Sequence, residues 1–170
     1  RAVADRAVSG CDAVMHVAGR TGSFGPDSLY KAANLDSTLN LLDACGDAGI
    51  TRFVYTSTPS VVHGGGDVAG ADESAPYPDH YETAYQRTKA AAERAVLRRN
   101  GDGMATVALR PHLVWGAGDS NLTQRVVERA RAGRLRFVGD GSNEVDGCYI
   151  GNAADAHVLA VEALDGGAAC

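Results

Sequence analysis

Short apolar runs alternate with longer amphipathic segments along this chain of 170 residues. The runs at 12–17, 52–57 and 106–109 have the length and apolar content of buried strands. The segments at 29–48 and 82–100 have the apolar spacing of helices, and each is followed closely by a glycine, a common helix stop. This alternation predicts an α/β fold built on a mostly parallel sheet.

The rest of the chain fits the same plan. Further helices are expected at the start of the chain, at 122–132 and at about 153–164, with short strands at 136–138 and 148–150. Residues 58–81 are rich in glycine and proline and lack periodicity, which predicts a long loop of the kind that often carries function. We find neither an internal repeat nor a linker, so a single domain is expected.

Composition excludes several classes of function. The net charge of −5 argues against a general binder of nucleic acid or of acidic membranes. No apolar run approaches the length of a membrane span. Cys11, Cys45, Cys148 and Cys170 form no CxxC pair, and the five histidines lack ligand spacing. We therefore expect no metal, no disulfide framework and a cytoplasmic location.

Tyr85 and Lys89 lie four residues apart at the start of the helix expected at 82–100. Residues at this spacing share one helical face, so the phenol and the ammonium can point the same way. A tyrosine with its ordinary pKa of about 10 is a weak base near neutrality, and a nearby cation lowers that pKa. The pair is a candidate for proton exchange with an alcohol or a carbonyl, although an isolated YxxxK more often marks a solvated helix face.

Hydroxyl groups end the strand expected at 52–57, one long loop before Tyr85. Parallel sheets bind ligands at the carboxyl ends of their strands. Thr58 is therefore a candidate for holding and polarising a substrate oxygen, with Ser57 as the neighbouring candidate. Strand-end hydroxyls also commonly cap backbone groups, so Thr58 alone does not identify a site.

Several segments, in order along the chain, resemble those of the extended short-chain dehydrogenases/reductases, the superfamily of NAD-dependent epimerases and dehydratases. VMHVAG resembles their fourth strand, RFVYTST the strand that ends in the catalytic Ser or Thr, and AYQRTKAAAERAVLRRNG the catalytic helix. ALRPHLVWGAGD and YIGNAADAHVLAVEAL resemble the segment over the nicotinamide and the helix after the substrate loop. The narrower likeness is to 3β-hydroxysteroid dehydrogenases/isomerases, sterol-4α-carboxylate 3-dehydrogenases and 2-alkyl-3-oxoalkanoate reductases.

This resemblance implies a Rossmann-like, doubly wound parallel sheet in three α/β/α layers that binds NAD or NADP. Tyr85 would be the acid/base, Lys89 would lower its pKa and bind the nicotinamide ribose, and Thr58 would orient the substrate oxygen. The other residues implied to contact or support the cofactor are Val17, Ala18, Gly19, Asn34, Pro111, His112 and Val114.

The GxxGxxG turn that opens this family and seats a pyrophosphate is absent from the sequence. Gly19, Gly22 and Gly25 are spaced three apart but follow the wrong strand. We therefore expect a central part of a family member, truncated at both ends: residues 1–170 as a single partial NAD(P)-binding domain, with the substrate-binding region starting at about 116. The strand at 12–17 would be an exposed edge, and this fragment alone should be inactive and bind dinucleotide weakly or not at all.

Three functions compete. The resemblance favours interconversion of a 3-hydroxyl and a 3-keto group on a steroid, sterol or long-chain oxoacid. A sugar-nucleotide epimerase is the alternative; a dehydratase is disfavoured because Pro59 and Ser60 stand where dehydratases carry an acidic pair. A non-catalytic dinucleotide sensor ranks last, since all three candidate catalytic groups are present. The resemblance also implies a small-molecule substrate and a homodimer through the helices near 29–48 and 82–100.

Overall fold

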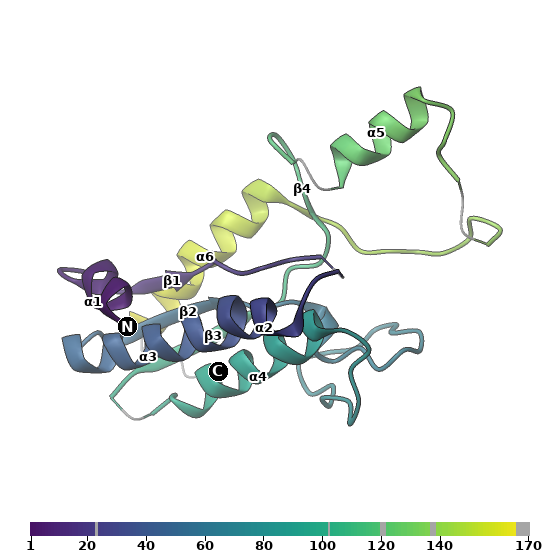
Figure 1. The fold of residues 1–170 in the computed structure, drawn as a ribbon. Coiled ribbons are helices and arrows are strands. Elements are labelled where there is room, and N and C mark those ends of the chain that lie inside the picture. Colours follow the sequence, from purple (N-terminus) through teal and green to yellow (C-terminus); the bar gives the residue numbers. More distant parts are fainter. Residues whose placement is uncertain (23, 102, 120–121, 137–138, 166–170) are drawn as a thin grey trace.

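The computed structural model describes residues 1–22, 24–101, 103–119, 122–136 and 139–165. Three parallel strands form its main sheet in the order β1-β2-β3: Val14–His16, Arg52–Thr56 and Ala105–Leu109 (Figure 1). The strand expected at 12–17 is shorter than predicted, because only its residues 14–16 pair with β2. β1 is one of the two edge strands of this sheet, as the sequence predicted, and β3 is the other.

Helices cover both faces of the sheet. α3 (Ser37–Ala48) and α4 (Ala84–Arg98) pack on one face, with α1 (Ala2–Val8) beside α3, and α6 (Ile150–Asp165) packs on the other (Figure 1). β2 faces both layers: Phe53 and Tyr55 enter the core with α3 and α4, whereas Thr56 contacts α6. A strand covered on both faces reads as a continuous apolar run, which is why this strand is the clearest in the sequence. The three-layer α/β/α prediction is confirmed.

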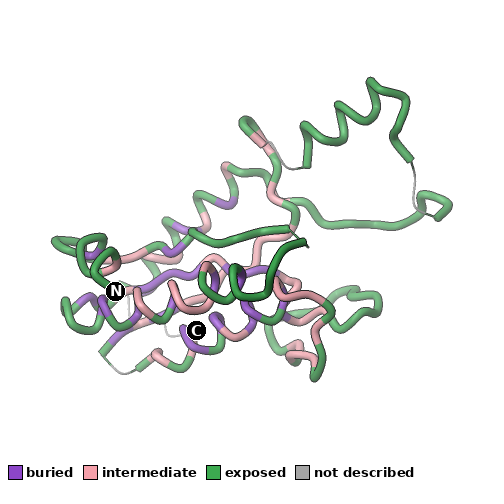
Figure 2. The backbone as a smooth tube through the Cα atoms, in the orientation of Figure 1, coloured by how far each residue is buried: buried purple, intermediate pink, exposed green. Residues whose placement is uncertain are grey.

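The core lies between the sheet and the layer formed by α3 and α4. Phe53 and Tyr55 of β2 meet Leu42 of α3 and Val96 of α4, and each of these side chains is buried. Figure 2 shows buried residues concentrated along the sheet and the helices beside it. The site described below is built at one end of this packed region.

The helix predicted at 29–48 contains an unexpected break in its hydrogen-bond pattern. It comprises α2 (Asp27–Tyr30), a π-helical segment (Lys31–Asp36) and α3, and it ends at Gly49, whose φ of 71° provides a left-handed cap. π-helical segments are rare and are often found at functional sites. This one carries Asn34, one of the predicted cofactor-site residues.

α4 begins two residues later than the sequence predicted, because Thr83 caps it. The Thr83 side chain accepts a hydrogen bond from the backbone N–H of Gln86, and the Gln86 side chain accepts one from the backbone N–H of Thr83. This reciprocal capping box fixes where the helix starts. It thereby places Tyr85 in the first turn, next to the end of β2.

The elements between β3 and α6 extend away from the core. β4 (Val114–Trp115) and β5 (Cys148–Tyr149) form a small parallel sheet, and α5 (Thr123–Arg131) lies between them in the sequence (Figure 1). The strand predicted at 148–150 is shorter because Ile150 already begins α6, three residues before its expected start. Of the strand predicted at 136–138, Arg136 is not in a strand, and residues 137–138 lie outside the described part. No helix in the described part is long and apolar enough to cross a membrane.

Candidate active site

Lys89 lies over the carboxyl end of β2. Its Nζ donates a hydrogen bond of 2.6 Å to the backbone carbonyl of Thr56 and lies 4.2 Å from the centre of the Tyr55 ring. The residue is only 5% exposed, which is rare for a lysine. α4 therefore delivers an ammonium group to the sheet edge where the sequence predicted a ligand site.

Tyr85 and Thr58 meet at the same edge. The Thr58 side chain lies near enough to the phenol of Tyr85 to lower its pKa, but burial of the half-buried phenol is the larger influence and raises that pKa overall. Thr58 is itself held by the backbone N–H of Ser60, at 3.3 Å from the Thr58 hydroxyl oxygen. The structure thus brings together the hydroxyl and the phenol that the sequence proposed as catalytic partners.

The Lys89 ammonium is directed at the Thr56 carbonyl and the Tyr55 ring. Burial raises the pKa of Tyr85 and the Thr58 side chain opposes that rise, so the lowering of this pKa by Lys89 stays a prediction. Burial also lowers the pKa of Lys89 itself to about 8, an effect that the carboxylate of Glu93 opposes.

Asn34 connects the loop after β1 to α4. Its side-chain oxygen accepts a hydrogen bond of 2.7 Å from the backbone N–H of Arg20, and its amide donates to the Arg20 carbonyl and to the Thr88 hydroxyl, each at 3.1 Å. Thr88 in turn donates to the carbonyl of Ala84. Asn34 thereby fixes the loop relative to the turn that carries Tyr85, and its supporting role at a cofactor site stays a prediction.

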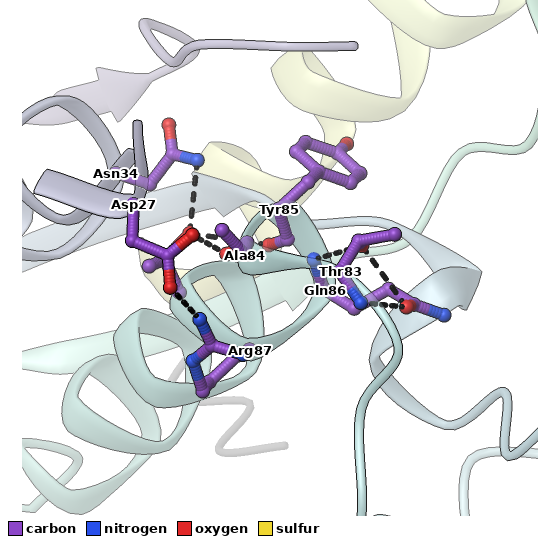
Figure 3. Close-up of polar contacts among 8 residues, drawn as sticks. Asp27, Asn34, Thr83, Ala84, Tyr85, Gln86 and Arg87 are labelled. Carbon is purple, nitrogen blue, oxygen red and sulfur yellow. Dashed lines mark hydrogen bonds and ion pairs between the residues drawn. The ribbon is translucent and has the colours of Figure 1, made fainter. Parts of the chain in front are cut away.

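Figure 3 shows this first turn of α4 from the side of Asn34. The Tyr85 ring projects away from the surface ion pair between Asp27 and Arg87, and the Thr83–Gln86 capping box closes the other side of the turn. The phenol is thereby held on the side of the helix away from that surface pair.

Val17, Ala18 and Gly19 form an exposed extended segment directly after β1. A Cβ on Gly19 would lie 3.2 Å from the Asn34 side-chain oxygen, so a residue without a side chain lets the backbone pass close to Asn34. The backbone groups of this segment are open at the same sheet edge as Lys89. Their position is compatible with the backbone cofactor contacts predicted for them.

Pro111, His112 and Val114 follow the end of β3. His112 and Ser60 both line a cavity of about 740 Å³ between the loop after β2, the end of β3 and residues 144–146. The carbonyl of His112 accepts a hydrogen bond of 3.0 Å from the backbone N–H of Cys148, and Val114 pairs with Cys148 in the small sheet. These residues border the site from the side opposite β1.

Sequence reasoning missed a buried ionic cluster beside Lys89. Glu93 is completely buried and accepts hydrogen bonds from the Tyr77 phenol and the Arg110 guanidinium, each with a shortest distance of 2.6 Å. The available signal was spacing, since Tyr85, Lys89 and Glu93 follow one another at intervals of four on one helical face.

Two histidines occupy the interior near the site. The Nε2 atom of His16 lies 2.9 Å from the Thr38 hydroxyl, and burial together with Lys89 lowers the pKa of His16 to about 4. His157 is buried on α6, with Nε2 2.6 Å from the Thr56 hydroxyl and Nδ1 2.6 Å from the Ala153 carbonyl. Within the described residues, no group of three or more acidic, His or Cys side chains could hold a metal.

Comparison with known proteins places this geometry in context. Residues 2–168 match the 3-beta hydroxysteroid dehydrogenase/isomerase family. The chain is 53% identical over 167 residues to a 2-alkyl-3-oxoalkanoate reductase of Stenotrophomonas maltophilia, covering 96% of this chain and 50% of that protein. It is 41% identical over 167 residues to a 3 beta-hydroxysteroid dehydrogenase/Delta 5→4-isomerase of Mycobacterium tuberculosis, covering 93% of this chain and 45% of that protein.

Among solved structures, a UDP-glucose 4-epimerase from Brucella ovis in complex with NAD superposes with a TM-score of 0.82 at 25% identity, covering 99% of this chain and 58% of that one. The Rossmann-like assignment is thereby confirmed. The chain spans about half the length of the curated relatives it matches. Because the family match extends over nearly all of its residues, the chain belongs to the 3-beta hydroxysteroid dehydrogenase/isomerase family.

Proposed function

We propose that this chain carries the catalytic groups of an NAD(P)-dependent oxidoreductase that interconverts a 3-hydroxyl and a 3-keto group on a steroid, sterol or long-chain oxoacid. The observation that carries the proposal is the buried Lys89, whose Nζ lies 2.6 Å from the Thr56 carbonyl at the carboxyl end of β2. Tyr85 precedes Lys89 by one turn of α4, and Thr58, which follows Thr56 by two residues, lowers the pKa of Tyr85. Membership of the family supports it, since the two relatives compared are named for chemistry at a 3-oxo or 3-hydroxy position.

The residues at this sheet edge fit a nicotinamide cofactor. The Ser57 hydroxyl is buried and has no hydrogen-bond partner among the described residues, so a polar group of a ligand could satisfy it. The backbone of residues 17–19 is exposed beside it, and Lys89 can donate to ribose hydroxyls. Bound nicotinamide would supply or accept the hydride. Pro111, His112 and Val114 would flank the ring, and Asn34 would hold the loop.

The protein's own groups would then handle the proton. In the reducing direction, Thr58 donates a hydrogen bond to the substrate oxygen and Tyr85 gives up its phenolic proton to that oxygen. The raised pKa of Tyr85 keeps the phenol protonated at neutral pH, which is the form that this step needs. Oxidation needs the phenolate, and the positive charge of Lys89 favours that form.

A sugar-nucleotide epimerase is the second candidate, favoured by the superposition on the Brucella ovis epimerase. Its lower identity gives it less weight than the two relatives named above. Homodimerisation through α2, α3 and α4, a substrate region starting at about 116, a cytoplasmic location and weak dinucleotide binding by this chain alone also stay predictions.

The test is turnover by the complete gene product that contains this chain. Nicotinamide absorbance is followed with a 3β-hydroxysteroid, a 2-alkyl-3-oxoacid and a UDP-sugar, with chromatography to detect epimerised sugar. Turnover of the steroid or the oxoacid should fall by ~10²–10⁴-fold in Tyr85→Phe, since the proton donor is lost.

Tyr81→Phe is the matched control because it also removes a single phenol. The Tyr81 hydroxyl donates to the Val61 carbonyl, 2.9 Å away, and we give it no proton-transfer role. Its turnover should stay near that of the wild type. Conversion of the UDP-sugar alone would transfer the proposal to the epimerase, and full activity of Tyr85→Phe would overturn it.

A further inference from the structure

Glu93 continues the line of functional side chains along α4. Tyr85, Lys89 and Glu93 are spaced by four residues, so they lie on one face of the helix. Glu93 is 0% exposed, although a carboxylate is almost never fully buried unless it is paired. The proposed proton transfer does not by itself explain why a carboxylate is buried at this position.

The partners of Glu93 come from the two segments that flank the site. Arg110, just after β3, donates to Glu93 from Nη2, 2.6 Å from Oε1, and from Nε, 3.2 Å from both Oε1 and Oε2. Tyr77, in the loop before α4, donates from 2.6 Å, and its ring lies 4.2 Å from the Arg94 guanidinium. The Glu93 carboxylate on α4 therefore bonds both the loop before α4 and the segment that follows β3.

Among the residues that the structure describes, few other charged groups lie near Lys89. The charge of Lys89 helps to lower the pKa of His16 on β1 to about 4, so His16 is neutral at physiological pH. Tyr55 on β2 and Tyr85 on α4 are uncharged phenols with raised pKa values. The acids that α2 and α3 present to α4 are paired at the surface, in the ion pairs Asp27–Arg87 and Asp43–Arg99.

We propose that Glu93 is a positioning residue that keeps Lys89 protonated, while Arg110 limits how strongly the Glu93 charge acts on Lys89. The expected effect of Glu93 on turnover rests on the proposed function, whereas its expected effect on the pKa of Lys89 does not. Glu93 raises the pKa of Lys89, whereas burial, the larger effect, lowers it. Lys89 would thus carry its charge in an interior that disfavours charge.

The chain makes this testable by NMR because it contains only two lysines, Lys31 and Lys89. The 170-residue chain is labelled with ¹³C at lysine, and the Cε chemical shifts are followed as a function of pH. This measures the pKa of Lys89, and the exposed Lys31 serves as an internal reference. Glu93→Gln should lower the pKa of Lys89 by ~0.5–2 units, because an attractive charge is removed. Arg110→Gln should raise it, because the Glu93 charge is then no longer shared with a guanidinium.

Asp27→Asn is the matched control, since it neutralises an exposed acid that pairs with α4 at the surface. It should leave the Lys89 pKa unchanged. Opposite shifts in Glu93→Gln and Arg110→Gln, with Lys31 unmoved, establish the proposal, since loss of packing alone gives no such sign reversal. An unchanged or raised pKa in folded Glu93→Gln overturns it. If Glu93→Gln does not fold, Arg110→Gln decides: a lowered or unchanged Lys89 pKa overturns the proposal.

The pH dependence of turnover is an independent second test of the role of Glu93. In the complete gene product, the alkaline limb of the pH profile of kcat/KM should move to lower pH in Glu93→Gln and to higher pH in Arg110→Gln. If the wild type turns over none of the substrates while the lysine shifts appear as expected, the proposed function fails and the role of Glu93 stands. If the wild type turns over a substrate but the pKa of Lys89 is the same in all variants, the role of Glu93 fails and the proposed function stands.

Discussion

Helices α4 and α5 show how differently two parts of this chain are built. α4 packs against β2, β3 and α3, and eight of its residues are buried. α5 buries none of its residues, and its apolar side chains Val126 and Val127 are 43% and 40% exposed (Figure 2). Both segments have a helical pattern in the sequence, yet only α4 contributes to the packed interior.

The buried face of α4 explains the contrast. It is made largely of small residues, such as Ala90 and Ala92, and of polar ones, including Lys89 and Glu93. Small residues allow close packing on the sheet, and the polar ones are held by specific partners such as Thr56 and Arg110. Burying a charge opposes folding, so its presence in the best-packed helix points to chemistry rather than to stability.

The largest expected effect separates the core from the α5 segment. Phe53→Ala, at a fully buried position of β2, should lower the free energy of unfolding by ~3–5 kcal/mol. Val126→Ala in α5 should change it by less than ~0.5 kcal/mol, because the side chain stays largely in water. Urea denaturation followed by circular dichroism measures both. Equal losses in the two variants would show that α5 is packed against something in solution.

The next effect is a pH dependence of stability that arises beside α4. His16 has a folded pKa of about 4, against an ordinary value of 6.5, so between these values the unfolded chain binds more protons. The contribution of His16 is therefore full above pH 6.5 and falls by ~3 kcal/mol as the pH drops to about 4. His16→Gln should flatten this part of the stability curve. An equally steep curve in the variant would assign the dependence to other groups.

The smallest expected effect compares the two helix starts. Thr83→Ala removes the capping box of α4 and should cost ~1 kcal/mol, with a range of ~0.5–2. Thr123→Ala at the first residue of α5 should stay within ~0.5 kcal/mol, because Asp119 caps that helix by accepting from the N–H groups of Leu122 and Thr123. Thermal denaturation of both variants gives the comparison. Equal costs would mean that the Thr123 side chain matters to α5 as much as the Thr83 cap matters to α4.

Much of the frame was predictable because its signals are local. Apolar runs and helical spacing located the sheet and the main helices, and family likeness selected Thr58, Tyr85, Lys89 and Asn34, which the structure brings to one region. The predicted roles of these residues remain to be tested.

What the sequence did not reveal depends on contacts between distant segments. Tyr77, Glu93 and Arg110 meet only after the chain folds, and His157 is buried because α6 lies against Thr56. The direction of the Lys89 side chain and the burial that raises the pKa of Tyr85 also follow from packing rather than from spacing.

The most direct test of the central claim is Lys89→Met, measured for both stability and turnover. Burial lowers the pKa of Lys89 to about 8, so the charged lysine opposes folding at neutral pH. We expect the neutral side chain to raise the free energy of unfolding of this chain by ~1–2 kcal/mol. In the complete gene product, the same substitution should abolish nicotinamide-dependent turnover. A less stable protein that keeps its turnover would contradict the account, because Lys89 would then serve the fold and not the chemistry.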